Sequence, residues 1–434
     1  MVSYESCCLV GGIYRFMINR IKEVTNSKLI KQTAFLTIAQ IIAMVIGFIS
    51  SMLLAKEMGV ELFGIYSFAI AIISFLAIFF EFGYFASVSR LLAINEDKTI
   101  EKEIIGASIA IVFGISILLF ITIFAISFLV DNIFEDKIGY IIRLASIVSW
   151  SFVLPFFMEL ILKGSNHIEY LSGFNILWKI LFLVVIIILY VGNMLIPLYV
   201  VLSFSITTIV SAIFFIYKLE PSFINLKKNI YNLNNENKVY GVHLYVGRVI
   251  DTATQQLDKL LIGFFVGAKD VGLYSLASSI ASPINSFSSA LSSSKFKSFS
   301  DRLEISKKVL RINLLWIVSA LIGANILGFI IIQYYLSIEY YDVQILLFFM
   351  SIAIAFQAAY QPYNAWLASN GYGRILKRKS IYTSILSLIL NFIFVPLYGS
   401  IGAAIAILLF MMHSFILHIY YYKKAIKNEK NSIS

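Results

Sequence analysis

Residues 53–72 read LLAKEMGVELFGIYSFAIAI, and residues 261–280 read LIGFFVGAKDVGLYSLASSI. The two segments are 208 positions apart in the chain, and seven of their twenty aligned positions are identical. The identical positions include two glycine pairs and the Tyr-Ser that follows: Gly59/Gly267, Gly64/Gly272, Tyr66/Tyr274 and Ser67/Ser275. Each segment is apolar on both sides of a short polar turn, so each predicts two helices joined near a glycine. The alternative is chance likeness between two apolar stretches, and the shared G-x4-G-x-Y-S spacing argues against it.

The rest of the chain is similarly apolar. Of its 434 residues, 60% are hydrophobic and 13% are charged, and the mean hydropathy is +0.88. Soluble domains are about 45–50% apolar and about 25% charged, so this chain has too little polar surface to be one. Cys7 and Cys8 are its only cysteines and are adjacent, which excludes a disulfide scaffold and a four-ligand zinc site. The composition therefore indicates an integral membrane protein.

A helix needs about 20 apolar residues to cross the roughly 30 Å of hydrocarbon in a bilayer. Twelve stretches qualify, near residues 33–55, 64–90, 104–130, 138–162, 168–191, 195–217, 239–266, 272–294, 311–334, 343–368, 380–398 and 400–422. We expect helices because lipid cannot satisfy the backbone of an open strand edge. The predicted fold class is all-α, a polytopic membrane protein of about twelve transmembrane helices.

The repeat divides these spans into two six-helix lobes. We expect an N-lobe at 33–218 and a C-lobe at 239–422, joined by a solvated, Asn- and Lys-rich cytoplasmic linker at 219–238. Residues 1–32 are expected to form a cytoplasmic arm, not a signal peptide, and residues 423–434 a basic cytoplasmic tail. Because six is even, the lobes are parallel repeats, the arrangement of transporters that rock around a central cavity.

The distribution of Lys and Arg predicts the orientation. With both termini inside, 27 of these residues lie in inside segments, three (Lys56, Lys137 and Lys269) in outside loops and four in spans. Positive charge favours the cytoplasmic side, so we predict that both termini are cytoplasmic. The net charge of +10 is then explained without a nucleic-acid partner.

Charged residues inside the spans are the main site candidates, since each costs at least about 2.5–3.5 kcal/mol at the membrane centre. The richest span is the seventh, where Arg248, Asp251, Gln255 and Asp258 are spaced three, four and three residues apart. This spacing places them on one helical face, which we expect to line the cavity. The alternatives are an internal Arg248–Asp251 pair and screening of Asp258 by Lys259.

Other spans add weaker candidates. Further residues expected to line the cavity are Lys259, Lys179, Arg143 and Gln40, with snorkelling to an interface as the alternative for Lys179 and Arg143. Candidates for ion coupling are Asp258, Asp251 and Glu81. Expected gating or structural positions are Gly59, Gly64, Gly267, Gly272, Pro283, Asn391 and Pro396. In the tenth span, Gln357, Tyr360, Gln361 and Tyr363 are suited to hydrogen-bonding or stacking on sugars, or to an aromatic belt.

The sequence contains no enzyme motif. Its four histidines have no metal-ligand spacing, and there is no P-loop, so we expect no metal, no cofactor and no ATP hydrolysis. The outside loops are too short for a periplasmic active site. A transporter driven by an ion gradient, by its substrate's gradient or by a partner is therefore favoured over an enzyme.

Three motifs resemble those of one family. The Gly59-x4-Gly64-Ile-Tyr-Ser junction, the Glu81-Phe-Gly83 segment followed by Arg90, and Asn391-FIFV-Pro396-LYG-SI-Gly402 are similar to motifs of Wzx-type polysaccharide-unit flippases. These belong to the multidrug/oligosaccharidyl-lipid/polysaccharide exporter (MOP) superfamily. The resemblance covers about residues 30–422, with the motifs in the family's order.

This resemblance implies a MATE-like fold and a function. Family members move undecaprenyl-pyrophosphate-linked oligosaccharides, of O-antigen or capsule type, from the cytoplasmic to the periplasmic leaflet by ion-coupled alternating access. The implied partners are the lipid-linked glycan, the bilayer, a polysaccharide polymerase and a chain-length regulator. The two aspartates beside Arg248 depart from the family's cationic cavity. A cation-coupled drug antiporter of the same fold is the alternative, and a membrane glycan polymerase or ligase the third interpretation.

Overall fold

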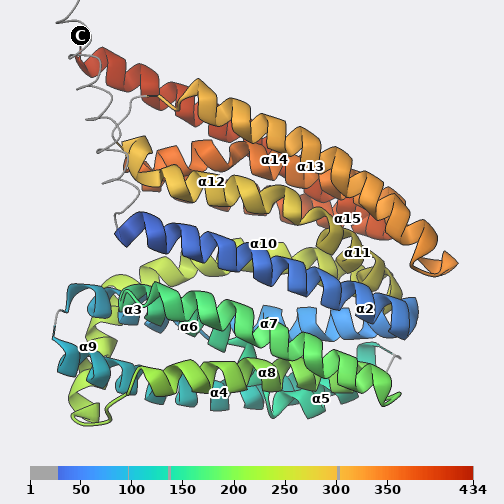
Figure 1. Ribbon diagram of the computed structural model, residues 1–434, viewed down its shortest axis with the longest axis horizontal. Helices are drawn as coiled ribbons and strands as arrows, with labels where there is room; N and C mark the ends of the chain where they lie inside the picture. The colour runs from blue at the N-terminus through green and yellow to red at the C-terminus, as the bar shows by residue number, and fades with distance from the viewer. Residues whose placement is uncertain (1–27, 96, 135–137, 301–303, 434) are drawn as a thin grey trace, which may run out of the picture.

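The computed structural model describes residues 28–95, 97–134, 138–300 and 304–433, and within them it contains helices and no strand (Figure 1). Most of the expected N-terminal arm and the loop with Lys137 lie outside these residues. The first half contains α2 (Lys28–Ile78), α3 (Tyr84–Ile94), α4 (Lys98–Ile133), α5 (Ile138–Ser146), η1 (Ser149–Phe152), α6 (Leu154–Gly164), α7 (Ile168–Val191) and α8 (Pro197–Lys218). The second half contains α9 (Leu226–Glu236), η2 (Asn237–Gly241), α10 (Val242–Phe265), α11 (Ala268–Ala281), α12 (Pro283–Ser300), α13 (Lys307–Tyr334), η3 (Ile338–Tyr340), α14 (Val343–Ser369) and α15 (Gly373–Ile433).

The described helices supply the twelve predicted spans. Seven of the described helices are each long and apolar enough to cross a membrane. Two of these seven, α2 and α15, hold two spans each because the chain turns at Gly59 (φ 73°) and Gly399 (φ 58°), a backbone conformation that favours glycine. Three more spans are α10, which carries four charged residues, and the interrupted pairs α5–α6 and α11–α12. The all-α polytopic fold is confirmed.

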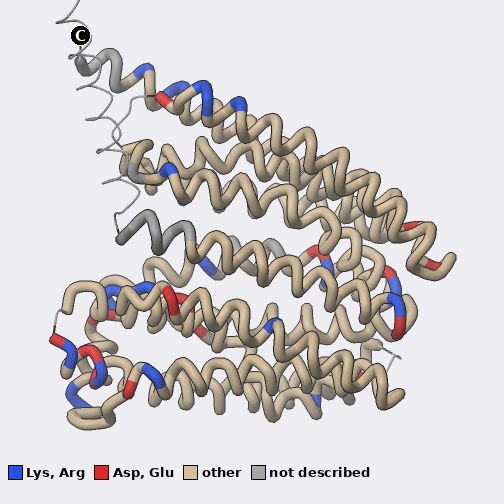
Figure 2. Tube along the Cα trace, in the orientation of Figure 1, with Lys and Arg blue, Asp and Glu red and all other residues tan. Residues whose placement is uncertain are grey.

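The helices form two groups with α2 and α10 between them. Figure 1 shows α3 to α9 on one side and α12 to α15 on the other. The helix α2 packs against α7 of the N-lobe and against α11 of the C-lobe, while α10 packs against α15 and α2. Figure 2 shows the charged residues mainly at the two ends of the bundle, with few between. This distribution is that of a bundle whose middle lies in lipid.

The two copies of the sequence repeat touch each other. A Cβ atom on Gly64 would lie 2.2 Å from the carbonyl oxygen of Ala268, and one on Gly272 would lie 2.8 Å from the Cα of Gly64. Only glycine permits so close a crossing of α2 and α11. The shared glycines thus mark the point where the lobes meet.

The segment between the lobes differs from the open linker that we predicted. Most of residues 226–241 are helical, and Asn229 and Leu233 are buried. Asn225 and Asn229 donate to the carboxylate of Glu103 on α4, at 3.1 and 2.9 Å. The amide side chains that suggested a solvated linker instead fix α9 to the N-lobe.

The second span is interrupted just before α3, and the start of α10 is fastened there. Phe82 (φ 47°) and Gly83 (φ 83°) turn the chain. The side-chain amide of Asn237 donates to the carbonyl of Phe82 at 3.0 Å. A Cβ on Gly83 would lie 2.5 Å from the carbonyl carbon of Gly241. The two lobes therefore meet at this end of the bundle as well as at the repeat glycines.

Candidate substrate cavity and ion site

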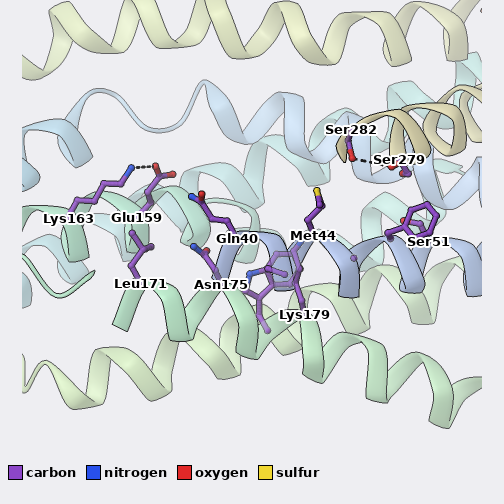
Figure 3. A pocket seen from close by; sticks show the side chains of 14 residues that line it. Gln40, Met44, Ser51, Glu159, Lys163, Leu171, Asn175, Lys179, Ser279 and Ser282 are labelled. Carbon is purple, nitrogen blue, oxygen red and sulfur yellow. Dashed lines mark hydrogen bonds and ion pairs between the residues drawn. The ribbon is translucent and has the colours of Figure 1, made fainter. Parts of the chain in front are cut away.

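A cavity of about 490 Å³ lies between the lobes. It is walled by α2, α6 and α7 of the N-lobe and by the end of α11 and Ser282 of the C-lobe (Figure 3). Its polar lining includes Gln40, Asn175 and Lys179, so two predicted cavity residues, Gln40 and Lys179, line it. The polar groups thus face a space that both lobes bound.

Lys179 is the cavity's distinctive charge. Its Nζ lies 2.9 Å from where a Cβ on Gly47 would be, so the glycine leaves room for the ammonium against α2. The same Nζ is 5.1 Å from the centre of the Trp178 ring, within range of a cation–π contact. Among the described residues Lys179 forms no ion pair, whereas Lys163 in the same cavity is bound to Glu159 at 2.5 Å. The cavity thus presents one uncompensated positive charge.

Arg248 joins the lobes. Its guanidinium donates to Glu81 in the interruption of the second span, with 3.1 Å between Nη1 and Oε1. It also lies over the ring of Phe156 on α6, 4.8 Å from the centroid. One turn before it, the hydroxyl of Tyr245 donates to the carbonyl of Phe79 at 2.8 Å. The ion-pair partner of Arg248 is therefore Glu81, which lies 167 positions earlier in the chain. The side chains of Asp251 and Gln255 lie outside the described part of the structure.

Asp258 lies in a buried polar cluster of the C-lobe. Its carboxylate accepts hydrogen bonds from the Tyr274 hydroxyl and from the Asn391 amide, both at 2.8 Å. Asp258 is 5% exposed and Asn391 1%, and the Oδ1 of Asn391 has no hydrogen-bond partner among the described residues. Asp258 and Lys259 also line a cavity of about 220 Å³. The cluster thus combines a buried carboxylate with an amide oxygen that has no hydrogen-bond partner among the described residues.

A second, larger cavity of about 780 Å³ lies among α10, α14 and α15. Its lining includes Gln357, Tyr360 and Gln361 of the tenth span, together with Arg248, Lys377 and Lys379, and no Asp or Glu among the described residues. Lys379 lies 3.3 Å from Nε2 of His418. The Nδ1 of His418 is 2.7 Å from the Ser414 carbonyl and donates to it, which leaves Nε2 to accept from the lysine.

Sequence reasoning missed Lys379 because we placed it in a loop. The helix α15 begins at Gly373, so Lys379 lies within it. The signal was present: Lys379, Thr383, Ser387 and Asn391 recur every four residues and share one helical face.

Arg143, predicted to line the cavity, lies elsewhere. It forms an ion pair with Asp131 across the α4–α5 contact and stacks on Phe128, 4.0 Å from the ring centroid. The prediction was wrong because the position of a charge along a span does not reveal which neighbouring helix offers it a partner. The described residues hold no cluster of three or more His, Cys, Asp or Glu side chains able to bind a metal ion.

The predicted structural positions lie at turns and close contacts. Gly267 has φ 129° where α10 gives way to α11, and Pro283 opens α12 as its first residue. Proline suits that place because the first helical residue needs no backbone hydrogen bond. Pro396 lies in α15 three residues before the turn at Gly399.

Comparisons with known proteins bear on the family and the fold. The profile of a family described as "Polysaccharide biosynthesis protein" matches residues 29–296. Among solved structures, the lipid II flippase MurJ in an inward closed conformation is similar, with a TM-score of 0.73, 17% identity, and 90% of this chain and 88% of that one covered.

Multidrug resistance transporters are similar too. An inward-facing multidrug resistance MATE transporter of the MOP superfamily gives a TM-score of 0.71 at 13% identity, covering 92% of this chain and 100% of that one. An outward-facing one gives 0.61 at 15%, covering 92% and 96%. At these identities the likeness shows the fold. A comparison with curated proteins found no match.

Proposed function

The chain belongs to the polysaccharide biosynthesis protein family, and from this premise we propose that it is a flippase for oligosaccharides linked to undecaprenyl pyrophosphate. Its fold is that of flippases and transporters, not of a glycan polymerase or ligase. The proposed direction is from the cytoplasmic to the periplasmic leaflet of a bacterial inner membrane, with both termini cytoplasmic. A polymerase and a chain-length regulator would act on the product, and no cofactor is needed.

The observation that carries this proposal is Lys179, which lies in the cavity between the lobes and forms no ion pair with any described residue. A pyrophosphate brings negative charge that lipid cannot solvate, and an ammonium in a partly desolvated cavity can compensate it. Gln40 and Asn175 offer amide groups to sugar hydroxyls in the same space. The larger cavity with Tyr360 and Gln361 gives the glycan more room. The polyprenyl tail would remain in the bilayer.

We further propose that Asp258 binds the ion that drives transport. The buried carboxylate and the unpartnered Oδ1 of Asn391 support this assignment. A proton or sodium ion held there would change the charge of α10, the helix that also carries Arg248. Ion occupancy could thereby bias the contact between the lobes at Glu81.

A cation-coupled drug antiporter is the second candidate, and Asp258 is the observation that favours it. A buried acid beside a cavity can bind a cationic drug as well as an inorganic ion. Lys179 opposes this interpretation, because an ammonium with no ion-pair partner among the described residues would repel a cation entering the cavity between the lobes.

Flipping of a fluorescent undecaprenyl-pyrophosphate glycan in proteoliposomes tests both proposals. Lys179→Gln should slow flipping at least tenfold, since a hydrogen bond to a charged group contributes about 1.5–3 kcal/mol. Lys56→Gln, which alters an exposed lysine outside the cavity, is the control and should be unaffected. Asp258→Asn should keep the basal rate but lose the response to an imposed proton or sodium gradient. Normal flipping by Lys179→Gln would refute the first proposal; gradient-driven export of a cationic dye without flipping would establish the antiporter.

A further inference from the structure

An apolar groove of about 660 Å³ runs along the outer side of the N-lobe. Its walls come from α4, η1, α6 and α8. Leu154 and Phe157 of α6 face the groove, whereas Glu159 and Lys163 of the same helix line the cavity between the lobes. The helix α6 therefore separates the two spaces, and a lipid whose head occupies the cavity would have to cross it to reach the groove.

The groove has the depth of one leaflet. Along α4 it extends from Ile109 to Phe120, which is about 16 Å at 1.5 Å per residue. This is about half of the roughly 30 Å hydrocarbon core. The hydroxyl of Ser116, also in the lining, donates to the carbonyl of Val112 at 2.7 Å and so needs no other partner. The lining thus suits a hydrocarbon chain that enters from one membrane face.

At one end the groove meets a further cavity whose lining includes two charged residues. Tyr217 and Pro221 belong to both, and the second cavity, of about 600 Å³, also contains Lys218 and Glu220. Lys218 is the last residue of α8. Its ammonium therefore lies at the end of an apolar helix, in the cavity that adjoins the groove.

Lys218 is held in place without being neutralised. Its Nζ lies 4.4 Å from the ring centroid of Phe214 and 5.8 Å from those of Tyr170 and Phe215. It forms no ion pair within the part of the chain that the structure describes. The neighbouring Glu220 is bound to Lys102 at 2.5 Å, and this hydrogen bond lowers the pKa of the Glu220 carboxyl. The carboxylate of Glu220 is therefore neutralised by Lys102 and not by Lys218. The Lys218 ammonium can then bind an anion from outside the protein.

We propose that the groove and Lys218 form a binding site for an anionic phospholipid. One acyl chain lies in the groove between α4, α6 and α8, and the phosphate lies at the Lys218 ammonium. A lysine that merely snorkels attracts anionic lipid in general, but here an ammonium in contact with an aromatic ring lies next to a groove of the size of an acyl chain. The occupant is a bilayer lipid and not the polyprenyl tail, because α6 separates this groove from the cavity proposed for the glycan head.

Nanodiscs with a phosphatidylcholine background and increasing phosphatidylglycerol provide the test. Binding of spin-labelled phosphatidylglycerol, measured as its motionally restricted fraction, should weaken about fivefold in Lys218→Gln, because a basic residue near the surface contributes about 1 kcal/mol. Lys218→Arg should retain binding, and Lys228→Gln, which removes an exposed lysine of α9 on the same side, is the matched control. Spin-labelled phosphatidylcholine should be unaffected by any of these changes.

A second variant addresses the groove itself. Ile213→Trp adds bulk at an exposed groove position and should reduce the restricted fraction of both lipids while leaving Lys218 in place. Equal loss in Lys218→Gln and Lys228→Gln would mean a general surface charge effect, and no preference for phosphatidylglycerol in the unaltered protein would overturn the proposal.

Discussion

At the scale of single residues, Arg248 and Glu81 carry a contact between the lobes, and Arg248 also lines the larger cavity. Arg248→Ala should destabilise the protein by about 3–5 kcal/mol, because it leaves the carboxylate of Glu81 without its partner. The double variant Arg248→Ala/Glu81→Ala should recover much of the thermal stability. If Arg248 also contacts the substrate, flipping should stay low in the double variant.

The Arg143–Asp131 pair is the control for that measurement, since it lies at the α4–α5 contact. Arg143→Ala should lower stability and leave the flipping rate per folded molecule unchanged. Recovery of flipping together with stability in the Arg248/Glu81 double variant would show that the pair is only structural.

The same pair marks a limit of sequence reasoning at the residue scale. Helical spacing predicts that Arg248 and Asp258 share a face, with a local Arg248–Asp251 pair as the alternative. Spacing along one helix says nothing about Glu81, which comes close only through the interruption of the second span. Partners far apart in sequence depend on tertiary packing and need the structure.

At the scale of elements, the crossing of α2 and α11 depends on two glycines that the sequence repeat had already singled out. Gly64→Ala would place a methyl group 2.2 Å from the Ala268 carbonyl oxygen, a clash with backbone that cannot be relieved by turning a side chain. Overpacking typically costs about 1–3 kcal/mol, and this contact should lie at or above the upper end. Thermal unfolding in detergent measures the loss.

Gly114 on α4 is the matched control, because a Cβ there would meet no atom within 4 Å. Gly114→Ala should be neutral or slightly stabilising, since glycine inside a helix costs about 0.5–1 kcal/mol relative to alanine. A Gly64→Ala protein as stable as the Gly114→Ala protein would contradict the close crossing.

At the scale of the whole molecule, composition and repeat were sufficient to predict a two-lobed helical membrane protein with about twelve spans. Hydropathy is a property of each segment alone, so spans such as α7 and α8 could be placed closely. The packing of α9 against the N-lobe could not be predicted, because an asparagine side chain can hydrogen-bond equally well to water or to Glu103. Likewise, Lys379 became a cavity residue only when α15 proved to start at Gly373.

The orientation of the whole molecule remains a prediction from the 27 basic residues on one side and three on the other. After replacement of Cys7 and Cys8 by serine, single cysteines at exposed positions report sidedness to a membrane-impermeant maleimide in intact cells. Lys56→Cys and Lys269→Cys, at opposite copies of the repeat junction, should both be labelled from outside. Lys228→Cys on α9 should be labelled only after the membrane is permeabilised. Labelling of Lys228→Cys in intact cells would show that the orientation is the opposite of the predicted one, and would contradict the proposed direction of glycan transport. Labelling at only one of the two junctions would refute parallel lobes, because parallel repeats must place both junctions on the same side.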